Sequence, residues 1–439
     1  MKKLLKFLSV IVLLLNIQSL SLVNAKEEKT EVIFWHVMSG DYEEMLNEQV
    51  KKFNETIGAE KGITVKAVQQ EWPNTSNLMT AMSANDLKNM PDVIQLSAEG
   101  VPVIRDYENT VVVEELMNEK SSVKKEDLIP SIASAYTIDG KMMGMPYAIS
   151  ALLMYYNQDA LEAAGYKEAP KTISELTEMV PKLTEVEGIE NAVNVGMDLY
   201  KLENFVTIQS KDGVEFGRNL NGHDGEFKEF IAGKEGHLLT FLKEWEKLGK
   251  TDGIKTLAEA EVDEFSMGLN AITIMSSSRI MKVKEMAEGT IKWNVAPIPT
   301  VSKDDIGGAN ASGSGLYILD RKEDKVEAAW EFVQFMASPE VQVSWLENTG
   351  YVPVNAKVEA LDEFKQAMEA NPELKVPFDV LSNTPEKVVP SYIPNYEEVG
   401  TLISETLEKV SLGELGAEEA NETLTKGIQE ILDTFYQAQ

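Results

Sequence analysis

Strand-type and helix-type segments alternate after residue 30, and this alternation limits the fold more than any other feature. Glu31–His36 is a short apolar run that predicts a buried strand, whereas Asp41–Ile57 carries its apolar residues on one helical face. Strands are expected again at Ile63–Val68 and Asp92–Leu96. This order favours parallel strands joined by right-handed crossovers, with ligands bound at the carboxyl ends of the strands.

A second unit of the same kind follows further along the chain. It begins with a strand at Leu152–Asn157, continues through a helix at Thr172–Leu183 that starts on an N-capping threonine, and returns to a strand near Val193–Met197. Trp293–Pro299 contains two prolines and is expected to be a crossover, and Leu316–Leu319 a strand. Because 439 residues exceed what one small core accommodates, two or more lobes are predicted.

Charge and cysteine content exclude several classes of function. The chain has 41 Lys+Arg against 72 Asp+Glu, a formal charge of −31, so it lacks a general basic surface and no nucleic-acid partner is expected. It contains no cysteine, which excludes disulfides, thiolate nucleophiles, Cys-ligated zinc and a lipid-modified N-terminal cysteine.

The first 25 residues have the pattern of a secretory signal peptide. Lys2, Lys3 and Lys6 give a basic start, Phe7 to Leu15 is nearly all apolar, and small residues end at Ala25. The apolar run is about 10 residues long, whereas a membrane span needs ~20. We therefore expect a cleaved signal, no membrane anchor, and a periplasmic location without a lipid anchor.

Catalytic and cofactor motifs are absent where the sequence can be tested. The three histidines, His36, His223 and His237, lack the spacing of a zinc protease, and no G-x-S-x-G elbow is present. Gly307–Gly315 has no P-loop lysine, and it is either a backbone approach to a bound polar ligand or a flexible loop. Neither a cofactor nor a metal is expected. An exported glycoside hydrolase stays open as an alternative because acidic pairs are plentiful, although most such pairs lie on solvated faces.

Several stretches, taken in order, resemble the family 1 extracellular solute-binding proteins of ABC importers, most closely the glycerol 3-phosphate and sugar-binding branch. They are Phe34-Trp35-His36-Val37-Met38-Ser39-Gly40, Pro91-Asp92-Val93-Ile94-Gln95, Tyr155-Tyr156-Asn157, Leu202-Glu203-Asn204-Phe205, the helix Ala329–Pro339, and Thr349-Gly350-Tyr351-Val352-Pro353-Val354. Each stretch is short, but their joint order and spacing across residues 31–436 are specific.

The resemblance implies an α/β protein with two lobes, each a mostly parallel sheet flanked by helices, and a ligand cleft between them. The expected division is a signal peptide at 1–25, lobe 1 at 26–148 plus 294–340, and lobe 2 at 149–293 plus 341–439. The implied role is the periplasmic substrate-binding component of an ABC transporter. Such a protein is a monomer that closes around a small molecule and delivers it to permease subunits in the inner membrane, without enzymatic activity.

The family's ligand contacts transfer to this chain one residue at a time. The positions that match or lie beside them, together with aromatic and acidic residues suited to sugar hydroxyls, are Trp72, Glu99, Ser150, Asp198, Tyr200, Ser276, Ser277, Gly313, Tyr351 and Tyr396. For the aromatic residues, packing in a hydrophobic core is the alternative explanation.

Two departures from the branch bear on the ligand. The tryptophan-rich segment expected before Leu202 is absent, and Ser391–Gly400 lacks the arginine that would pair with a phosphate. Because a buried dianion needs fixed positive charge, a neutral carbohydrate or polyol is favoured over a glycerol 3-phosphate or glycerophosphodiester ligand. Arg279 is the residue that could replace the missing arginine if it points inward.

A surface adhesin is a third possible function, beside solute binding and glycoside hydrolysis, and such a protein would lack a closable crevice.

Overall fold

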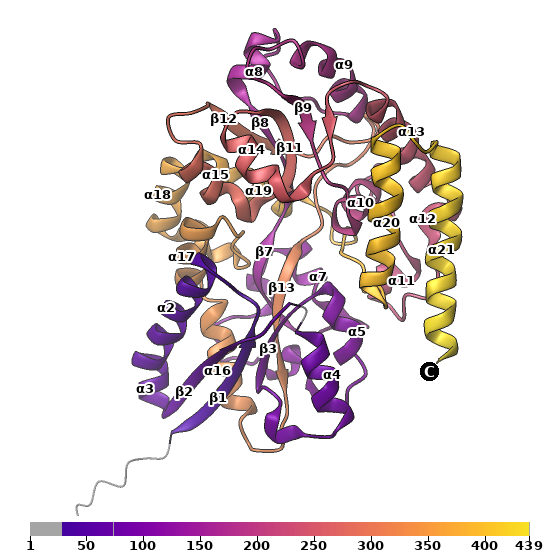
Figure 1. Ribbon diagram of the computed structural model, residues 1–439. Helices are drawn as coiled ribbons and strands as arrows, with labels where there is room; N and C mark the ends of the chain where they lie inside the picture. The colour runs from indigo at the N-terminus through magenta and orange to yellow at the C-terminus, as the bar shows by residue number, and fades with distance from the viewer. Residues whose placement is uncertain (1–28, 73, 439) are drawn as a thin grey trace, which may run out of the picture.

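The computed structural model describes residues 29–72 and 74–438, and the chain forms two lobes, each built on its own sheet (Figure 1). The first sheet has the order β2-β1-β3-β13-β4, and β7 also pairs with β13. Its strands are β1 (Thr30–His36), β2 (Ile63–Gln69), β3 (Val93–Ser97), β4 (Thr110–Val111), β7 (Met145–Ser150) and β13 (Ser312–Leu319).

The second sheet has the order β10-β9-β11-β8-β12. Its strands are β8 (Leu152–Asn157), β9 (Asn191–Asn194), β10 (Ile254–Lys255), β11 (Asn270–Ser276) and β12 (Trp293–Pro297), and a separate hairpin consists of β5 (Thr137–Ile138) and β6 (Lys141–Met142). Only Ala151 separates β7 from β8, so the chain passes directly from one sheet to the other at this point.

Helices cover both sheets. Those before β8, together with the first four after β13, are α2 (Asp41–Glu55), α3 (Ile57–Lys61), α4 (Thr75–Ser83), α5 (Val101–Ile104), α6 (Val113–Leu116), α7 (Pro130–Ser134), α16 (Val326–Met336), α17 (Pro339–Thr349), α18 (Asp362–Ala370) and α19 (Lys375–Asn383). The others are α8 (Gln158–Ala163), α9 (Ile173–Leu183), α10 (Leu199–Thr207), α11 (Arg218–Gly222), α12 (Ile231–Lys234), α13 (His237–Gly249), α14 (Glu261–Ser266), α15 (Ile280–Met286), α20 (Tyr396–Ser411) and α21 (Ala417–Gln437). Short 3₁₀ turns lie at Leu87–Asn89, Ala98–Gly100, Lys125–Asp127, Ala258–Ala260, Ser277–Arg279, Ala356–Ala360 and Pro372–Leu374.

Buried aromatic residues pack against one another inside each lobe. In the first lobe, Phe34 of β1 and Phe53 of α2 each pack on Phe332 of α16, with ring centroids 5.3 Å apart. In the second, Phe205 of α10 stacks on Phe241 of α13 at 5.2 Å. Burying such rings removes apolar area from water, which is the dominant favourable contribution to folding.

The predicted fold class, a two-lobed α/β protein with the periplasmic binding protein architecture, is confirmed. The sheets are mixed, however, rather than mostly parallel. β1 pairs in parallel with β2 and β3, whereas β13 is antiparallel to β3, β4 and β7. The reason is that β13 enters the first sheet from the other lobe, and β8 enters the second sheet in the same manner, antiparallel to β11 and β12.

Two local predictions can be compared with the structure directly. Thr172 is the N-cap of α9, and its hydroxyl accepts a hydrogen bond from Glu175 N at 3.1 Å, as expected. The crossover expected at Trp293–Pro299 is instead the edge strand β12, which pairs with β8. Its proline, Pro297, is the last residue of the strand, where a missing N–H is tolerated. Because β12 belongs to the second sheet, residues 294–297 do not follow the expected division, which assigned them to lobe 1.

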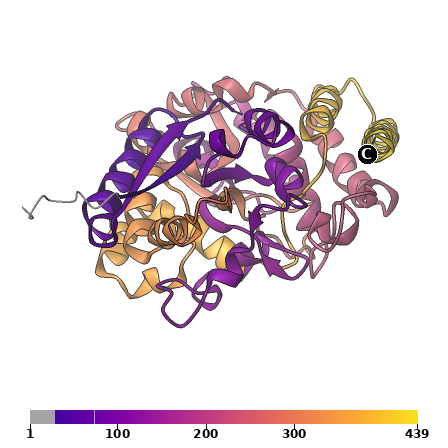
Figure 2. The same cartoon turned by 90° about the horizontal axis from the view of Figure 1, so that it is seen from below.

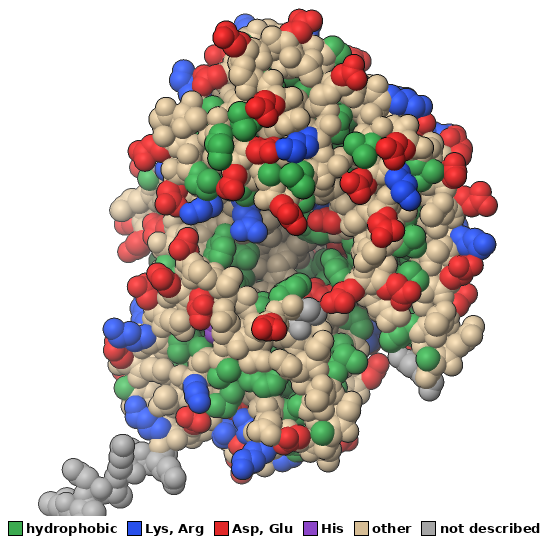
Figure 3. Space-filling model, in the orientation of Figure 1, with side chains coloured by type: hydrophobic (Ala, Val, Ile, Leu, Met, Phe, Trp, Pro, Cys, Tyr) green, Lys and Arg blue, Asp and Glu red, His purple; other side chains and the backbone are tan. Residues whose placement is uncertain are grey.

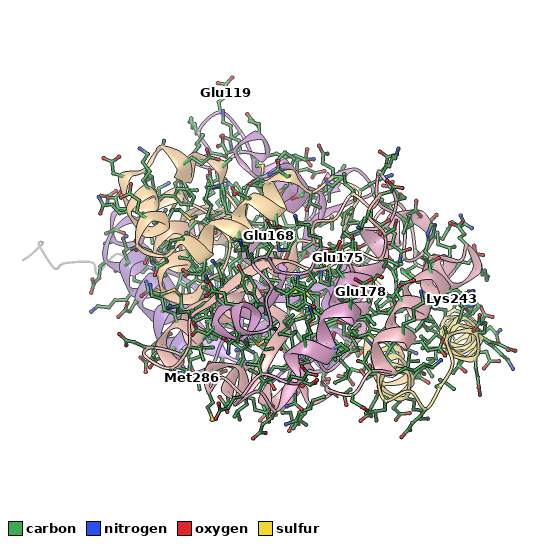
Figure 4. The ribbon with its side chains drawn as sticks, turned by 90° about the horizontal axis from the view of Figure 1, so that it is seen from above. Glu119, Glu168, Glu175, Glu178, Lys243 and Met286 are labelled. Atoms are coloured by element: carbon green, nitrogen blue, oxygen red, sulfur yellow. The ribbon has the colours of Figure 1, made fainter. Side chains whose placement is uncertain are left out.

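Helices α20 and α21 form an outer pair beside the second lobe, and they extend down toward the first (Figures 1 and 2). Both pack on α13, where Lys243 reaches Glu418 of α21 at 3.3 Å. Figure 4 shows Lys243 at this edge of the molecule and Glu168, Glu175 and Glu178 on the outer face around α9. These three glutamates therefore lie on the outer surface of the second lobe.

The expected signal peptide at 1–25 lies outside the described residues. Within the part of the chain that is described, no helix combines the length and the apolar character that a membrane span requires.

Candidate ligand-binding site

The two lobes meet around a cavity with a volume of about 200 Å³, which we call the central cavity. Figure 3 shows the surface hollowed between the upper and lower halves of the molecule. The lining residues come from both halves of the chain: Trp72, Ser97, Ala98, Glu99, Ala135, Tyr136, Ser150, Tyr200, Glu203, Ala311, Ser312, Gly313, Tyr317, Pro390, Tyr392 and Tyr396.

Strand ends bring these residues together. β3 ends at Ser97 and leads directly into Glu99, and Trp72 follows the end of β2. Ser150 ends β7, opposite Ser312 at the start of β13. The cavity thus lies at the carboxyl ends of the parallel strands, where open α/β sheets bind their ligands.

Three oxygen atoms in the lining are buried and form no well-aligned hydrogen bond among the described residues: Tyr200 OH, Ser312 Oγ and Tyr317 OH. Tyr200 interacts weakly with Ser150 and Ser312, and Tyr317 with Tyr392. A buried polar atom without a partner costs free energy, and native proteins rarely leave one unexplained. Because these three lie beside an open volume, a ligand with several hydroxyl groups would satisfy them.

Two carboxyl groups line the same cavity, Glu99 from the first lobe and Glu203 from the second. Burial raises the pKa of Glu99 to about 7, and burial likewise raises the pKa of Glu203 to about 7 although Ser391 N donates to its Oε2 at 3.0 Å. A protonated carboxyl group can donate a hydrogen bond, whereas an ionised one only accepts. Near neutral pH, Glu99 and Glu203 can therefore pair with ligand hydroxyls that accept a hydrogen bond and with ligand hydroxyls that donate one.

No lysine or arginine belongs to the described lining of the central cavity. Arg279 is exposed at the 3₁₀ turn after β11 and does not line it. Arg105 donates to Gly222 O and Gly225 O at 2.8 Å each and pairs with Asp139. The cavity therefore offers no fixed cation to neutralise a buried phosphate.

An unusual turn holds the wall that carries Pro390 and Tyr392. Asn219, Leu220 and Asn221 are consecutive residues with left-handed φ angles of 61°, 50° and 58°. Such a conformation is costly for leucine and persists only where surrounding contacts enforce it. Asn221 supplies those contacts: its Nδ2 donates to Val389 O at 2.8 Å, and its carbonyl accepts from Tyr392 N at 2.9 Å.

His223 follows this turn and ties the same wall to the first lobe. Its ring nitrogens lie 2.9 Å from Thr137 O and 2.9 Å from Pro390 O, and its ring stacks on Tyr392. Burial lowers the pKa of His223. The wall is thus fixed from two sides before any ligand arrives.

Six of the ten residues predicted for the site lie together in the lining: Trp72, Glu99, Ser150, Tyr200, Gly313 and Tyr396. Trp72 is 59% exposed, so much of its side chain is accessible to a ligand. Gly313 has a φ of 120°, and a Cβ there would lie 2.0 Å from Ala148 O. This position requires glycine so that β13 can approach β7 closely.

Three others have structural tasks outside the lining. Asp198 is the N-cap of α10, where its Oδ1 accepts from Lys201 N at 2.8 Å. Ser276 caps the 3₁₀ turn that follows β11, and Ser277 Oγ accepts from Ala151 N at 3.2 Å at the junction of the sheets. Their side chains are engaged with the backbone.

Tyr351, the tenth, belongs to what we call the aromatic stack. Its ring is parallel to that of Trp345 within 4° at 5.7 Å, and Trp345 stacks on Tyr147 at 5.2 Å. Tyr42 packs edge-on against Tyr351 and donates from its hydroxyl to Ser278 O at 2.9 Å, which links α2 to the second lobe. None of these four aromatic residues lines the central cavity.

The sequence analysis missed several lining residues: Ser97, Tyr136, Glu203, Ser312, Tyr317 and Tyr392. Signals existed for two of them. Glu203 stands inside a stretch that carried the family resemblance, and Ser312 precedes Gly313. The tyrosines carried no local signal, because whether an aromatic residue packs in a core or faces a cavity depends on contacts distant in sequence.

The chain belongs to the bacterial extracellular solute-binding protein family, whose family model matches residues 48–375. A curated relative, the sn-glycerol-3-phosphate-binding periplasmic protein UgpB of Salmonella paratyphi A, is 24% identical over 420 residues, which cover 93% of this chain and 94% of the relative.

Solved structures share the fold over nearly the whole chain. The sugar-binding protein MalE of Xanthomonas citri has a TM-score of 0.75 at 22% identity, covering 93% of this chain and 99% of that one. UgpB of Mycobacterium tuberculosis, in complex with glycerophosphocholine, has a TM-score of 0.74 at 20% identity, with coverage of 94% and 99%. The protein is accordingly a solute-binding component of an ABC importer and not an enzyme.

Proposed function

We propose that this protein binds a neutral carbohydrate or polyol in the central cavity and delivers it, chemically unaltered, to permease subunits in the inner membrane. Its two lobes close on the ligand because residues of both contribute contacts. It acts in the periplasm as a monomer after removal of residues 1–25, without a lipid anchor. The ligand contacts that we assign are the six predicted residues in the lining, together with Glu203, Ser312 and Tyr317.

One observation carries the ligand class. Among the described residues, the lining combines unpartnered hydroxyls and two carboxyl groups with tyrosine and tryptophan rings, and it includes no basic side chain. Aromatic faces pack on the apolar C–H faces of sugar rings, while hydroxyl and carboxyl groups satisfy the ring's hydroxyls. An ionised phosphate in this setting would add negative charge to an already acidic cavity.

A glycerol 3-phosphate or glycerophosphodiester is the second candidate. It is favoured by the curated relatives, which are named as sn-glycerol-3-phosphate-binding proteins. The described lining contains no lysine or arginine, which argues against a phosphorylated ligand. Desolvating an unpaired phosphate costs several kcal/mol.

A thermal-shift panel on residues 26–439 tests the proposal. We expect a rise in Tm with at least one sugar or polyol, since a ligand at 100 times its Kd adds about 2.7 kcal/mol to the free energy of unfolding. A rise in Tm only with phosphorylated compounds would favour the second candidate over the carbohydrate. If no sugar, polyol or phosphorylated compound raises Tm, both candidate ligands are refuted.

Two phenylalanine variants localise the site. Tyr200→Phe removes one unpartnered hydroxyl from the central cavity and should reduce the ligand-dependent shift. Tyr156→Phe is the matched control, because Tyr156 lies on β8 outside the lining. Equal shifts in the two variants would place the ligand elsewhere.

A further inference from the structure

Arg105 connects the two lobes directly, and we call its contacts the arginine bridge. The residue follows the last turn of α5, which Figure 1 shows next to α11. Its Nη1 donates to Gly222 O and Gly225 O at 2.8 Å each, and its Nη2 lies 2.6 Å from Asp139 Oδ2. The Arg105 side chain is 11% exposed, so these three oxygen atoms replace most of the water that would otherwise surround the charge.

The bridge joins a side chain of one lobe to the backbone of the other. Ile104, directly before Arg105, is buried in the hydrophobic core that surrounds the first sheet. Phe216 and Phe227, on either side of the two glycines, are buried in the core that surrounds the second sheet. The hydrogen bonds from the guanidinium to the glycine carbonyls therefore break when the lobes move apart.

The shape of the turn at residues 219–225 makes the bridge possible. Gly222 and Gly225 have left-handed φ angles of 91° and 111°, which glycine adopts without the steric cost that other residues incur. In this turn, carbonyl oxygens three residues apart accept hydrogen bonds from the same guanidinium nitrogen. Hydrogen bonds from a charged donor are stronger than those between neutral groups. The turn thus presents two well-placed acceptors to the first lobe.

The same turn supports the wall of the central cavity. Asn221, next to Gly222, accepts a hydrogen bond from Tyr392 N at 2.9 Å, and the ring of His223 stacks on that of Tyr392 at 4.0 Å. Tyr392 lines the central cavity, whereas Arg105 does not. Arg105 therefore acts on a bound ligand only through the turn and the wall.

Open space separates the lobes beside the bridge. A groove of about 660 Å³ is lined by α4 and α5 of the first lobe and by Tyr396–Glu398 at the start of α20. Pro102 and Val103 of α5 belong to this lining and precede Arg105 by three and two residues. Because side chains of the two lobes do not fill this groove, the bridge supplies polar contacts at an edge where packing does not hold the lobes together.

We infer that Arg105 is a positioning residue for ligand binding, which favours the arrangement of the lobes in which the wall at Pro390–Tyr392 faces the first lobe. A ligand that contacts both lobes binds only to this closed arrangement, so its apparent Kd rises as the population of the arrangement falls. The inference rests on the part of the proposed function that places a ligand between the lobes, and it is independent of the chemical class of that ligand.

Distances across the groove test the inference without any ligand. Because the chain contains no cysteine, Asn77→Cys on α4 and Thr401→Cys on α20, both at exposed positions, give two unique sites for spin labels. In pulsed electron paramagnetic resonance of the ligand-free protein, Arg105→Met should raise the population of separated lobes at least about threefold. An unchanged distance distribution would overturn the inference.

Arg218→Met is the matched control for this measurement. Arg218 begins α11, but it pairs at 3.1 Å with Glu229, which belongs to the same lobe. Its replacement should leave the distances across the groove unchanged. Arg105→Lys keeps the charge and a donor, so it should restore part of the population that Arg105→Met loses.

Asp139→Asn provides a milder variant in case Arg105→Met does not fold. Asp139 has a left-handed φ of 49°, a conformation that asparagine tolerates, so the change removes the carboxylate charge of the bridge without straining the backbone. It should lengthen the distances in the same direction as Arg105→Met but less. Distances equal to those of the wild type in this variant would count against the bridge.

Affinity measurements connect the bridge to ligand binding. For the compound that gives the largest rise in Tm in the thermal-shift panel, calorimetry should show a Kd at least about fivefold weaker in Arg105→Met and within about twofold of the wild type in Arg218→Met. Longer distances with an unchanged Kd would overturn the positioning role. If no compound of the panel binds but the distances lengthen, the proposed function is refuted and the effect of Arg105 on the lobes is supported.

Discussion

The central cavity and the aromatic stack both contain tyrosines at the junction of the lobes, but only the tyrosines of the cavity lie beside an open volume. Among the described residues, both regions hold buried polar atoms that lack a well-aligned hydrogen bond: Tyr200 OH and Tyr317 OH in the cavity, Tyr147 OH and Trp345 Nε1 in the stack. Those of the cavity adjoin an open volume, whereas Trp345 and Tyr147 are enclosed by neighbouring rings. An unpartnered atom therefore indicates a ligand only where there is space for one.

Of the variants considered, Trp345→Ala should have the largest effect on stability, and it tests whether the aromatic stack is separate from the ligand site. Trp345 is fully buried, and truncating such a side chain costs about 3–5 kcal/mol of the free energy of unfolding. Urea denaturation measures this loss, and calorimetry of the remaining folded protein should give a ligand Kd within about threefold of the wild type. A stable Trp345→Ala variant that no longer binds the ligand would show that the aromatic stack is part of the ligand-binding site.

The pH dependence of stability tests whether the central cavity is as dry as the burial of its carboxyl groups indicates. Burial raises the pKa of Glu203 from 4.5 to about 7, so the folded protein holds this proton over a range in which the unfolded chain has released it. The contribution of Glu203 to stability is therefore largest at low pH and is lost as the pH rises from about 4.5 through 7. Between pH 5.5 and 8 the loss should be about 2 kcal/mol.

Glu203→Gln, which keeps the shape and removes the charge, is the variant that isolates this contribution. The difference in the free energy of unfolding between pH 5.5 and 8 should be about 2 kcal/mol smaller in the variant than in the wild type. Urea titrations at the two pH values measure it. An identical pH dependence would show that Glu203 ionises normally and that the cavity is wetter than its burial indicates.

Asp198→Ala tests a predicted site residue that the structure places at a helix end. Removing this N-cap of α10 should lower the free energy of unfolding by about 1 kcal/mol. Ligand affinity should remain within about twofold of the wild type, because Asp198 does not line the central cavity. A strong loss of affinity with unchanged stability would restore Asp198 as a ligand contact.

Tyr317→Phe should have the smallest effect on stability and a modest one on binding. Its buried hydroxyl forms no well-aligned hydrogen bond among the described residues, so its removal should change the melting temperature of the free protein little. Loss of one hydrogen bond to the ligand should weaken the affinity by about three- to tenfold. A lower melting temperature without any change in Kd would make Tyr317 a packing residue.

The sequence was sufficient for the segments whose structure depends on local pattern. The strand Leu152–Asn157 and the helix capped by Thr172 were predicted with almost the bounds observed, because periodicity and capping are read from neighbouring residues. The strand β12 was mistaken for a crossover, since its partner β8 lies more than 130 residues away and prolines at an edge strand resemble those of a loop.

The candidate site was less accessible to prediction. The resemblance pointed to Glu99 and Tyr351, and the chemistry of sugar recognition added Tyr200. Glu99 and Tyr200 line the central cavity, whereas Tyr351 lies in the aromatic stack. Tyr351 and Tyr200 are the same residue type, and what distinguishes them is the ring of Trp345 against one and open space against the other. That difference arises from tertiary packing, which no local pattern encodes.

The left-handed turn at Asn219–Asn221 has a practical consequence for anyone who wishes to retarget this protein. It fixes the backbone of Val389–Tyr392 from behind, through Asn221, without contributing a side chain to the lining. A library that randomises Tyr200 or Ser312 would change the side chains that face the ligand, whereas one that alters Asn221 would disturb the backbone that carries Pro390 and Tyr392.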